Sequence, residues 1–286
     1  MKILDLYYID IDKNEISTDI NFLFPNWKCN EERLCIFSPH DDDAVLGAGY
    51  AISAAIRNGA EVYIYIFCRG NAGYSTIDEK DSIEGVRVDE TYSSYNMLGI
   101  KDENIIRFNY SDFSVCQSLG WQLNNGEEGS FKDIITSLRK NRITRLLVPN
   151  HYREHLDHWA VGMLGTFYAP QAGDLVLVDW NEPKEIKSVV QYSTWGDLSP
   201  EDQLVKGRAD GLRANRLIVA SEDVEQEVCG AIMKYRSQID IIDGLINIRK
   251  NRKNSRGMYV EVYLSYDPRP KMDFLPYIEL ADQLIP

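Results

Sequence analysis

Residues 33–49 read RLCIFSPHDDDAVLGAG, and this stretch predicts a strand, a turn and a helix in succession. The apolar run from Leu34 to Phe37 is typical of a buried strand. Residues 44–57 favour a helix, and Asn58-Gly59 is a suitable C-terminal stop. One histidine and three aspartates separate the strand from the helix. Polar side chains just beyond a strand in such a unit predict a functional site.

The rest of the chain repeats this alternation of strands and helices. Helices are expected at residues 83–98, at 157–168 and after Ser221, and further strands at 61–67, 105–108, 145–148, 174–179, 188–192, 217–220 and 259–263. Such a pattern predicts an α/β fold with a Rossmann-like, mostly parallel sheet, helices on both faces, and a site at the C-terminal strand ends. The sequence shows no internal repeat or long linker, so we expect residues 1–286 to form a single domain.

The charge and composition of the chain limit the class of molecule that it is expected to bind. The formal net charge of -13 and the pI of about 4.8 disfavour nucleic acid and anionic membranes. Asp5 and Asp10 interrupt any apolar N-terminal core, and no apolar run approaches the roughly 20 residues that span a bilayer. The five cysteines form no CxxC pair, which is typical of reduced thiols. We therefore expect a cytoplasmic protein that acts on a small molecule, without nucleic acid or membrane as partner; the oligomeric state stays open.

All four histidines lie in two short segments, each just after a predicted strand. His40 belongs to the first segment, whereas His151, His155 and His158 belong to the second, at residues 149–162. Neighbouring strands would bring both segments to one edge of the sheet. Three adjacent carboxylates repel one another, and a divalent cation offsets that repulsion. Imidazole and carboxylate groups together are a common ligand set for catalytic zinc.

Each segment alone has a simpler interpretation. An acidic run after a strand is usually a solvated turn or a helix N-terminus, and an HxxH pair occurs by chance. Their joint occurrence favours a metal site, in which a spare carboxylate removes a proton from water and a second histidine stabilises the oxyanion. Gly47-Ala48-Gly49 lacks the third glycine of a dinucleotide loop, and the basic run at residues 249–256 is expected to be a solvated loop.

Residues 40–47, HDDDAVLG, resemble the first motif of the PIG-L family of metal-dependent N-deacetylases, His-Pro-Asp-Asp-Glu-Val-Leu-Gly. Val45-Leu46-Gly47 sets the register among the three aspartates. The resemblance then implies that His40 and Asp43 are metal ligands and that Asp42 is the general base. Asp41 stands at the position of the family proline.

Residues 155–161, HLDHWAV, are similar to the second family motif. That similarity implies His158 as the third metal ligand, His155 as the acid or oxyanion group, and Asp157 as the group that orients His155. The implied metal is Zn²⁺, with Fe²⁺ as an alternative.

Weaker resemblances concern the substrate. Arg87 is similar to an arginine of the family that faces the substrate, and Asp112 to an acid that contacts the sugar. Arg153 stands where some relatives carry a tyrosine that helps the oxyanion, and it is our third substrate-binding candidate. Lys234 to Gln238 resembles a late family segment that ends in Ser-Gln.

The resemblance implies hydrolysis of the acetamide of a soluble N-acetylated amino sugar, similar to N-acetylglucosamine, with release of acetate and a free amine. An aminoglycoside-type antibiotic intermediate is one candidate substrate. Two alternatives stay open: a metal-dependent esterase or amidase on a non-sugar substrate, and a sugar-binding descendant without catalysis.

Overall fold

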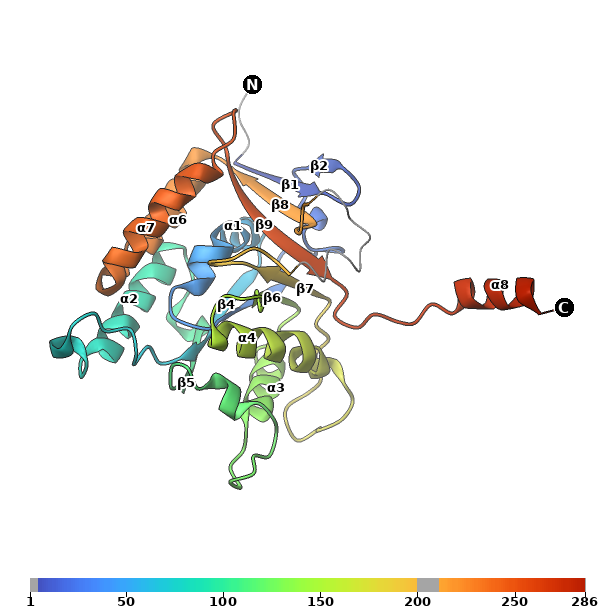
Figure 1. Ribbon diagram of the computed structural model, residues 1–286, viewed down its shortest axis with the longest axis horizontal. Coiled ribbons are helices and arrows are strands. Elements are labelled where there is room, and N and C mark those ends of the chain that lie inside the picture. The colour runs from blue at the N-terminus through green and yellow to red at the C-terminus, as the bar shows by residue number, and fades with distance from the viewer. Residues whose placement is uncertain (1–4, 200–210, 286) are drawn as a thin grey trace.

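The structure is a computed structural model that describes residues 5–199 and 211–285 (Figure 1). Within these residues a nine-stranded sheet has the order β2-β1-β8-β9-β7-β6-β3-β4-β5. The strands are β1 (Leu6–Asp10), β2 (Glu15–Ser17), β3 (Arg33–Ser38), β4 (Glu61–Cys68), β5 (Ile105–Tyr110), β6 (Arg145–Pro149), β7 (Ser188–Tyr192), β8 (Arg216–Ala220) and β9 (Tyr259–Tyr266).

The sheet is mixed, which corrects the expectation of a mostly parallel, Rossmann-like sheet. The strands β7-β6-β3-β4-β5 pair in parallel, whereas β9, β8, β1 and β2 continue the sheet through antiparallel pairs. An apolar run indicates that a strand is buried, but it does not indicate the direction of its neighbour. That direction depends on where the connecting chain crosses the sheet.

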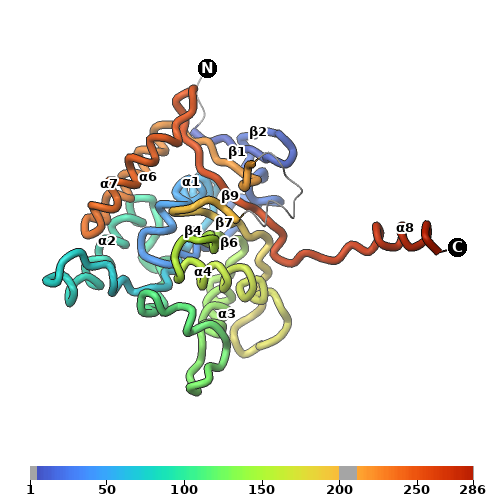
Figure 2. Tube along the Cα trace, in the orientation of Figure 1, coloured from blue at the N-terminus to red at the C-terminus, as the bar shows by residue number. Residues whose placement is uncertain are grey.

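Helices cover both faces of the sheet. Alternate residues of β3 point to opposite sides: Leu34 and Ile36 join one core, and Cys35 and Phe37 join the other. The first core contains residues of α1 (Asp43–Arg57), α2 (Ile83–Met97) and α6 (Glu222–Ile232), and the second contains residues of α3 (Ser130–Lys140) and α4 (Leu156–Met163). The tube in Figure 2 shows α7 (Ile239–Arg249) alongside α6, and α8 (Leu275–Leu284) standing away from the sheet. None of the described helices is long and apolar enough to span a membrane.

The strand predicted at residues 174–179 is wrong, because these residues form a loop. The buried guanidinium of Arg139 supplies the physical reason. It donates hydrogen bonds to the backbone carbonyls of Ala172, Asp174, Val176 and Leu177, at 2.7 to 3.0 Å. These carbonyls are therefore satisfied by one side chain in α3 rather than by a neighbouring strand.

The basic run at residues 249–256 begins with a buried residue, which corrects the expectation of a solvated loop. Arg249 ends α7, and its side chain is only 2% exposed. Its guanidinium donates to Glu225 of α6 at 2.6 Å and lies 3.4 Å from Glu261 of β9. The remaining strands and helices named from the sequence are present, whereas β1, β2, α3, α7 and α8 were not predicted.

Candidate metal centre

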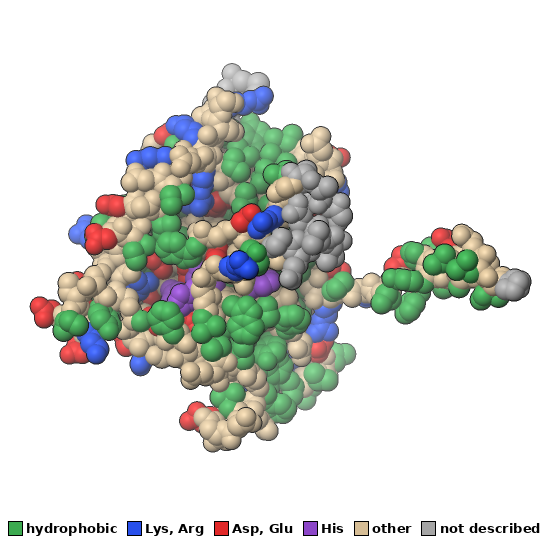
Figure 3. Space-filling view, viewed as in Figure 1, with side chains coloured by type: hydrophobic (Ala, Val, Ile, Leu, Met, Phe, Trp, Pro, Cys, Tyr) green, Lys and Arg blue, Asp and Glu red, His purple; other side chains and the backbone are tan. Residues whose placement is uncertain are grey.

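Two loops meet at the carboxyl ends of β3 and β6, which are neighbouring parallel strands. The loop after β3 carries His40 and leads into α1 at Asp43, and the loop after β6 carries His155 and leads into α4, which contains His158. The space-filling view shows histidine side chains in a hollow of the surface (Figure 3). The expected meeting of the two histidine segments is therefore confirmed.

His40, Asp43 and His158 form one of three possible ligand groups among the described residues. Asp43 Oδ2 lies 3.1 Å from His40 Nδ1 and 3.0 Å from His158 Nε2. Ligand atoms at about 2.0–2.2 Å from a tetrahedral ion lie roughly 3.3 Å apart. The spacing and the donor types fit a divalent metal. In the two other groups the donor atoms lie within 4.8 Å of one another; these groups are His40 with His155 and Asp157, and His40 with Cys68 and Asp112.

The charges around these atoms favour a cation. Burial alone would lower the pKa of His158, but the Asp43 carboxylate raises it to about 9. Burial opposes ionisation of Asp43 as well, yet the adjacent histidines hold its pKa far below the usual range. The carboxylates thus raise the pKa of the His40 and His158 rings, although burial opposes this rise. A divalent cation offsets the same negative charge and uses the same lone pairs.

Glu154 contacts the ring nitrogen of His158 that faces away from Asp43, although sequence reasoning did not select this glutamate. Its Oε2 lies 2.7 Å from His158 Nδ1. Its Oε1 accepts hydrogen bonds from the backbone N–H groups of Thr194, Trp195 and Gly196 at 2.9 to 3.1 Å. A carboxylate on the second nitrogen of a metal-binding histidine sets the tautomer of that ring. The spacing of four residues between Glu154 and His158 was the available signal.

Asp42 lies beside the ligands and lines a cavity of about 470 Å³. It precedes α1 as its N-cap residue, and its side chain is 13% exposed. Arg87 donates from Nη2 to Asp42 Oδ1 at 3.1 Å. Burial raises the pKa of Asp42 although the charge of Arg87 opposes that rise. A carboxylate with a raised pKa at a cavity wall has the properties of a general base.

Asp41, by contrast, is fully buried and belongs to the packing of the loop. Its backbone carbonyl accepts hydrogen bonds from the hydroxyls of Tyr95 and Tyr235 at 2.8 and 2.6 Å. Its carboxylate accepts from the side chains of Arg87, Thr91 and Arg107. Nothing in the sequence indicated Arg107. The loop is thus held by hydrogen bonds where the family motif has a proline.

The structure places His155 and Asp157 close to His40. His155 Nδ1 accepts the backbone N–H of Asp157 at 3.1 Å. The Asp157 carboxylate lies 3.3 Å from His40 Nε2 and 3.6 Å from His155 Nδ1. The longer distance exceeds a normal hydrogen bond, so direct support of His155 by this carboxylate stays a prediction. Asp157 is held by the backbone N–H groups of Phe113 and Val115.

The three substrate-binding candidates occupy different places. Arg87 and Asp112 line the same cavity as Asp42. Asp112 also accepts the backbone N–H groups of Gly70 and Ala72, both at 2.9 Å, so it shapes the cavity rim. Arg153 is exposed, and its guanidinium lies 5.5 Å from the centroid of the Tyr152 ring, outside the lining of this cavity. Gln238, at the end of the late segment, lines the cavity and donates to the Gly73 carbonyl.

Solved structures with the same fold were identified. The N,N'-diacetylchitobiose deacetylase from Pyrococcus horikoshii has a TM-score of 0.62 at 20% identity, over 83% of this chain and 84% of that one. The 4-carboxy-2-hydroxymuconate hydratase GalB from Pseudomonas putida has a TM-score of 0.60 at 15% identity, over 85% and 99%. The zinc-inhibited form of the teicoplanin deacetylase Orf2 has a TM-score of 0.55 at 20% identity, over 82% and 97%. A search of curated proteins gave no match.

Residues 35–168 match the protein family described as PIG-L: GlcNAc-PI de-N-acetylase. This range includes the strand β3, both histidine loops and the helix α4 that carries His158. This part of the chain is therefore similar to the PIG-L family, and the matched range contains the candidate metal centre.

Proposed function

We propose that this protein is a metal-dependent hydrolase that removes the acetyl group from the amine of an N-acetylated amino sugar. The observation that carries the proposal is the convergence of His40 and His158 on one oxygen of Asp43. Asp42 and His155 line the same cavity, so a base and an acid stand beside the ligand set.

His40, Asp43 and His158 would hold the metal, with Zn²⁺ as our first choice and Fe²⁺ as the alternative. When bound, a divalent ion polarises the amide carbonyl and lowers the pKa of water toward neutrality. Glu154 supports this role by accepting the Nδ1 proton of His158, which leaves Nε2 as the ligand atom.

Asp42 is the proposed general base, which accepts a proton from the attacking water. Its raised pKa brings its basicity closer to the operating pH than that of an exposed aspartate. Arg87 holds the carboxylate through Oδ1 and limits its rotation.

His155 is the proposed acid and oxyanion donor. Because Nδ1 accepts a backbone N–H, the proton of the neutral ring lies on Nε2, which is then a donor. In the neutral ring this donor stabilises the developing oxyanion; transfer of a proton to the leaving amine requires the imidazolium form, which carries a proton on both nitrogens and becomes the neutral ring. Asp157 supports the arrangement through His40 and through its negative charge near His155.

A sugar-type substrate is favoured by the polar rim of the cavity. Arg87 and Asp112 are the proposed partners of its oxygens and hydroxyls, and the exposed Arg153, outside the cavity lining, stays the third candidate. Two proteins with this fold are deacetylases of chitobiose and of teicoplanin, which supports the assignment. GalB, however, has this fold and is a hydratase, so the fold alone does not select the reaction.

The decisive experiment is a panel of N-acetylated amino sugars, with acetate and the free amine measured by mass spectrometry. We expect about one divalent ion per chain by elemental analysis, and loss of turnover on chelation that is reversed by zinc or iron(II). Hydrolysis of O-acetyl but not N-acetyl sugars would favour the esterase alternative. A protein without metal, and without a gain of activity when metal is added, would favour the binding-only alternative.

A further inference from the structure

A second cavity of about 430 Å³ adjoins the one that contains the metal centre. Trp195 and Ile241 line both cavities, so the two share a wall. The volume of the second cavity is within the range of small-molecule sites, about 300–1,000 Å³. A molecule bound at the metal centre therefore has a neighbouring space into which a substituent can extend.

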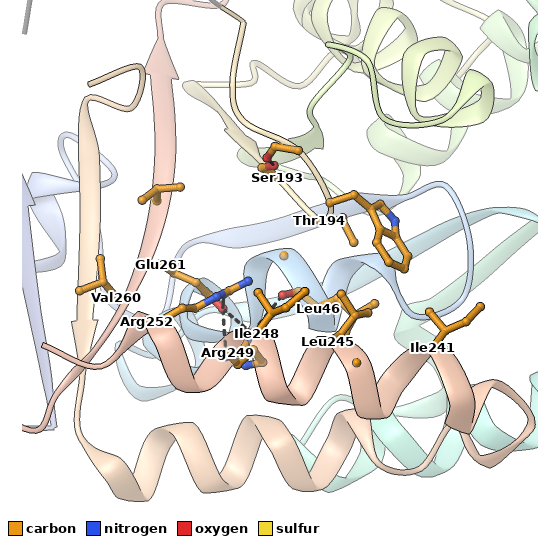
Figure 4. A pocket seen from close by; sticks show the side chains of 15 residues that line it. Leu46, Ser193, Thr194, Ile241, Leu245, Ile248, Arg249, Arg252, Val260 and Glu261 are labelled. Carbon is orange, nitrogen blue, oxygen red and sulfur yellow. Dashed lines mark hydrogen bonds and ion pairs between the residues drawn. The ribbon is translucent and has the colours of Figure 1, made fainter. Parts of the chain in front are cut away.

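Aliphatic side chains form much of the wall of the second cavity. Ile241, Leu245 and Ile248 rise from one face of α7 toward the loop that contains Ser193 and Thr194 (Figure 4). Ile241 and Ile248 are 51% and 58% exposed, and Leu245 between them is partly buried against the core. Val260 and Val262 add further apolar surface from β9. Such a surface gains free energy when another apolar group covers it.

The charged groups in this cavity already have partners. Arg249 pairs with Glu225 and Glu261, and Arg252 lies 3.6 Å from Glu261. Because guanidinium and carboxylate groups balance here, the cavity offers little net charge to an ion. An uncharged apolar group fits these walls better than an anion or a cation.

The second cavity is tied structurally to the metal centre. Glu154 holds His158 through one carboxylate oxygen and the backbone of residues 194–196 through the other. The segment that carries Trp195 is thereby fixed relative to the metal ligand. A substrate that fills both cavities meets a preformed arrangement, which reduces the entropy lost on binding.

We propose that the second cavity is a subsite for a hydrocarbon group of the substrate whose amide is cleaved at the metal centre. The inference rests on the proposed function for the position of the amide. Two parts of an amino-sugar amide could supply the hydrocarbon: an alkyl or aryl aglycone, or an acyl chain longer than acetyl. The substrate class is then an amphiphilic amino-sugar amide rather than a simple polar sugar.

Gly244 offers a way to fill the cavity without disturbing the fold. It lies in α7 and lines the second cavity, and a Cβ added there meets no atom within 4 Å. Gly244→Phe should therefore occupy the space, and removal of a helical glycine does not disfavour α7. Gly85→Phe is the matched control, because Gly85 lies in the helix α2, has the same open surroundings, and lines neither cavity.

The test compares KM for three substrates in the wild type and both variants. The reference is the methyl glycoside of N-acetylglucosamine, one arm replaces methyl by hexyl, and the other replaces N-acetyl by N-hexanoyl. We expect at least one hexyl arm to lower KM by about tenfold or more in the wild type. The ratio of KM for the methyl glycoside to KM for the hexyl compound should fall toward one in Gly244→Phe and stay high in Gly85→Phe. The hexyl compound whose KM falls in the wild type identifies the source of the hydrocarbon.

A binding measurement separates this proposal from the proposed function. Calorimetric titration of Asp42→Asn with the methyl and hexyl compounds needs no turnover. If no N-acetyl sugar is hydrolysed but a hexyl compound binds about tenfold more tightly, and Gly244→Phe removes that gain, the function fails and the subsite stands. If the methyl glycoside is hydrolysed and neither hexyl compound binds more tightly than it, the subsite is overturned and the function stands. The same conclusion follows if Gly244→Phe leaves the tighter binding of a hexyl compound unchanged.

Discussion

The metal centre and the cluster around Arg249 both bury carboxylates, yet they differ in what faces those carboxylates. In the Arg249 cluster, Glu225 and Glu261 accept hydrogen bonds from a guanidinium that is 2% exposed. In the metal centre, Asp43 is equally buried but faces two imidazoles, from His40 and His158.

The donor type decides the difference in chemistry. A guanidinium has no lone pair to offer, so a carboxylate paired with arginine forms a closed, structural unit. An imidazole keeps a lone pair when neutral and can exchange its proton for a metal. Buried charge alone therefore does not mark a functional site, whereas carboxylate and imidazole converging at a cavity wall do.

The largest expected effect is on Asp42, the carboxylate that faces the cavity beside the ligands. Asp42→Asn keeps the shape of the side chain but cannot accept the proton of water. Turnover should fall by roughly 10²–10⁴-fold while the metal stays bound. Acetate release and elemental analysis on the same preparation check this.

Asp41→Asn is the matched control one residue away. Because Asp41 is buried between Arg87 and Arg107, its loss should lower the free energy of unfolding and affect turnover much less. An inactive Asp41→Asn beside a nearly normal Asp42→Asn would refute the register among the three aspartates.

Arg249→Met tests the closed cluster. It leaves Glu225 and Glu261 buried without their guanidinium, and the free energy of unfolding should fall by about 3–5 kcal/mol. Urea unfolding measures the loss, and metal content per folded chain should not change. The exposed Arg256 provides the control Arg256→Met, with an effect within about 0.5 kcal/mol. Equal losses in both variants would contradict the structural role of the cluster.

Replacement of His155 and of His158 should have different effects on metal content and turnover. His155→Ala is expected to cut turnover by about 10²–10³-fold with metal retained, because a donor is lost but no ligand. His158→Ala should lower metal occupancy directly, because its Nε2 faces Asp43. Metal analysis of both variants checks the assignment, and an equal loss of metal from both would show that the roles are wrong.

The smallest effect is expected from Glu154, which contacts Nδ1 of the proposed metal ligand His158. Glu154→Gln should weaken metal affinity by about 10–100-fold, because the amide holds the His158 ring less firmly. Competition with a chelator measures the affinity. Glu182→Gln, at a glutamate that is 91% exposed, is the control; unchanged affinity in Glu154→Gln would remove Glu154 from the site.

Much of the parallel half of the sheet was predictable because its strands are continuous apolar runs that end in turn residues. Leu146 and Leu147 in β6 and Ile64 in β4 show this pattern. The short strand β2 and the amphipathic α3 lack such runs, so they were missed. The strand predicted at residues 174–179 was wrong because their apolar pattern does not indicate that Arg139 binds their backbone carbonyls. The single domain over residues 1–286 stays a prediction.

The sequence by itself determined the α/β class, the two histidine loops and the order of residues within each motif, because these follow from local periodicity and spacing. Only the tertiary structure decided the antiparallel half of the sheet, the roles of Arg107 and Glu154, and the second cavity beside Trp195. These depend on contacts between residues far apart in the chain. Asp41 meets Arg107, and Glu154 meets Gly196, through packing that no local pattern records.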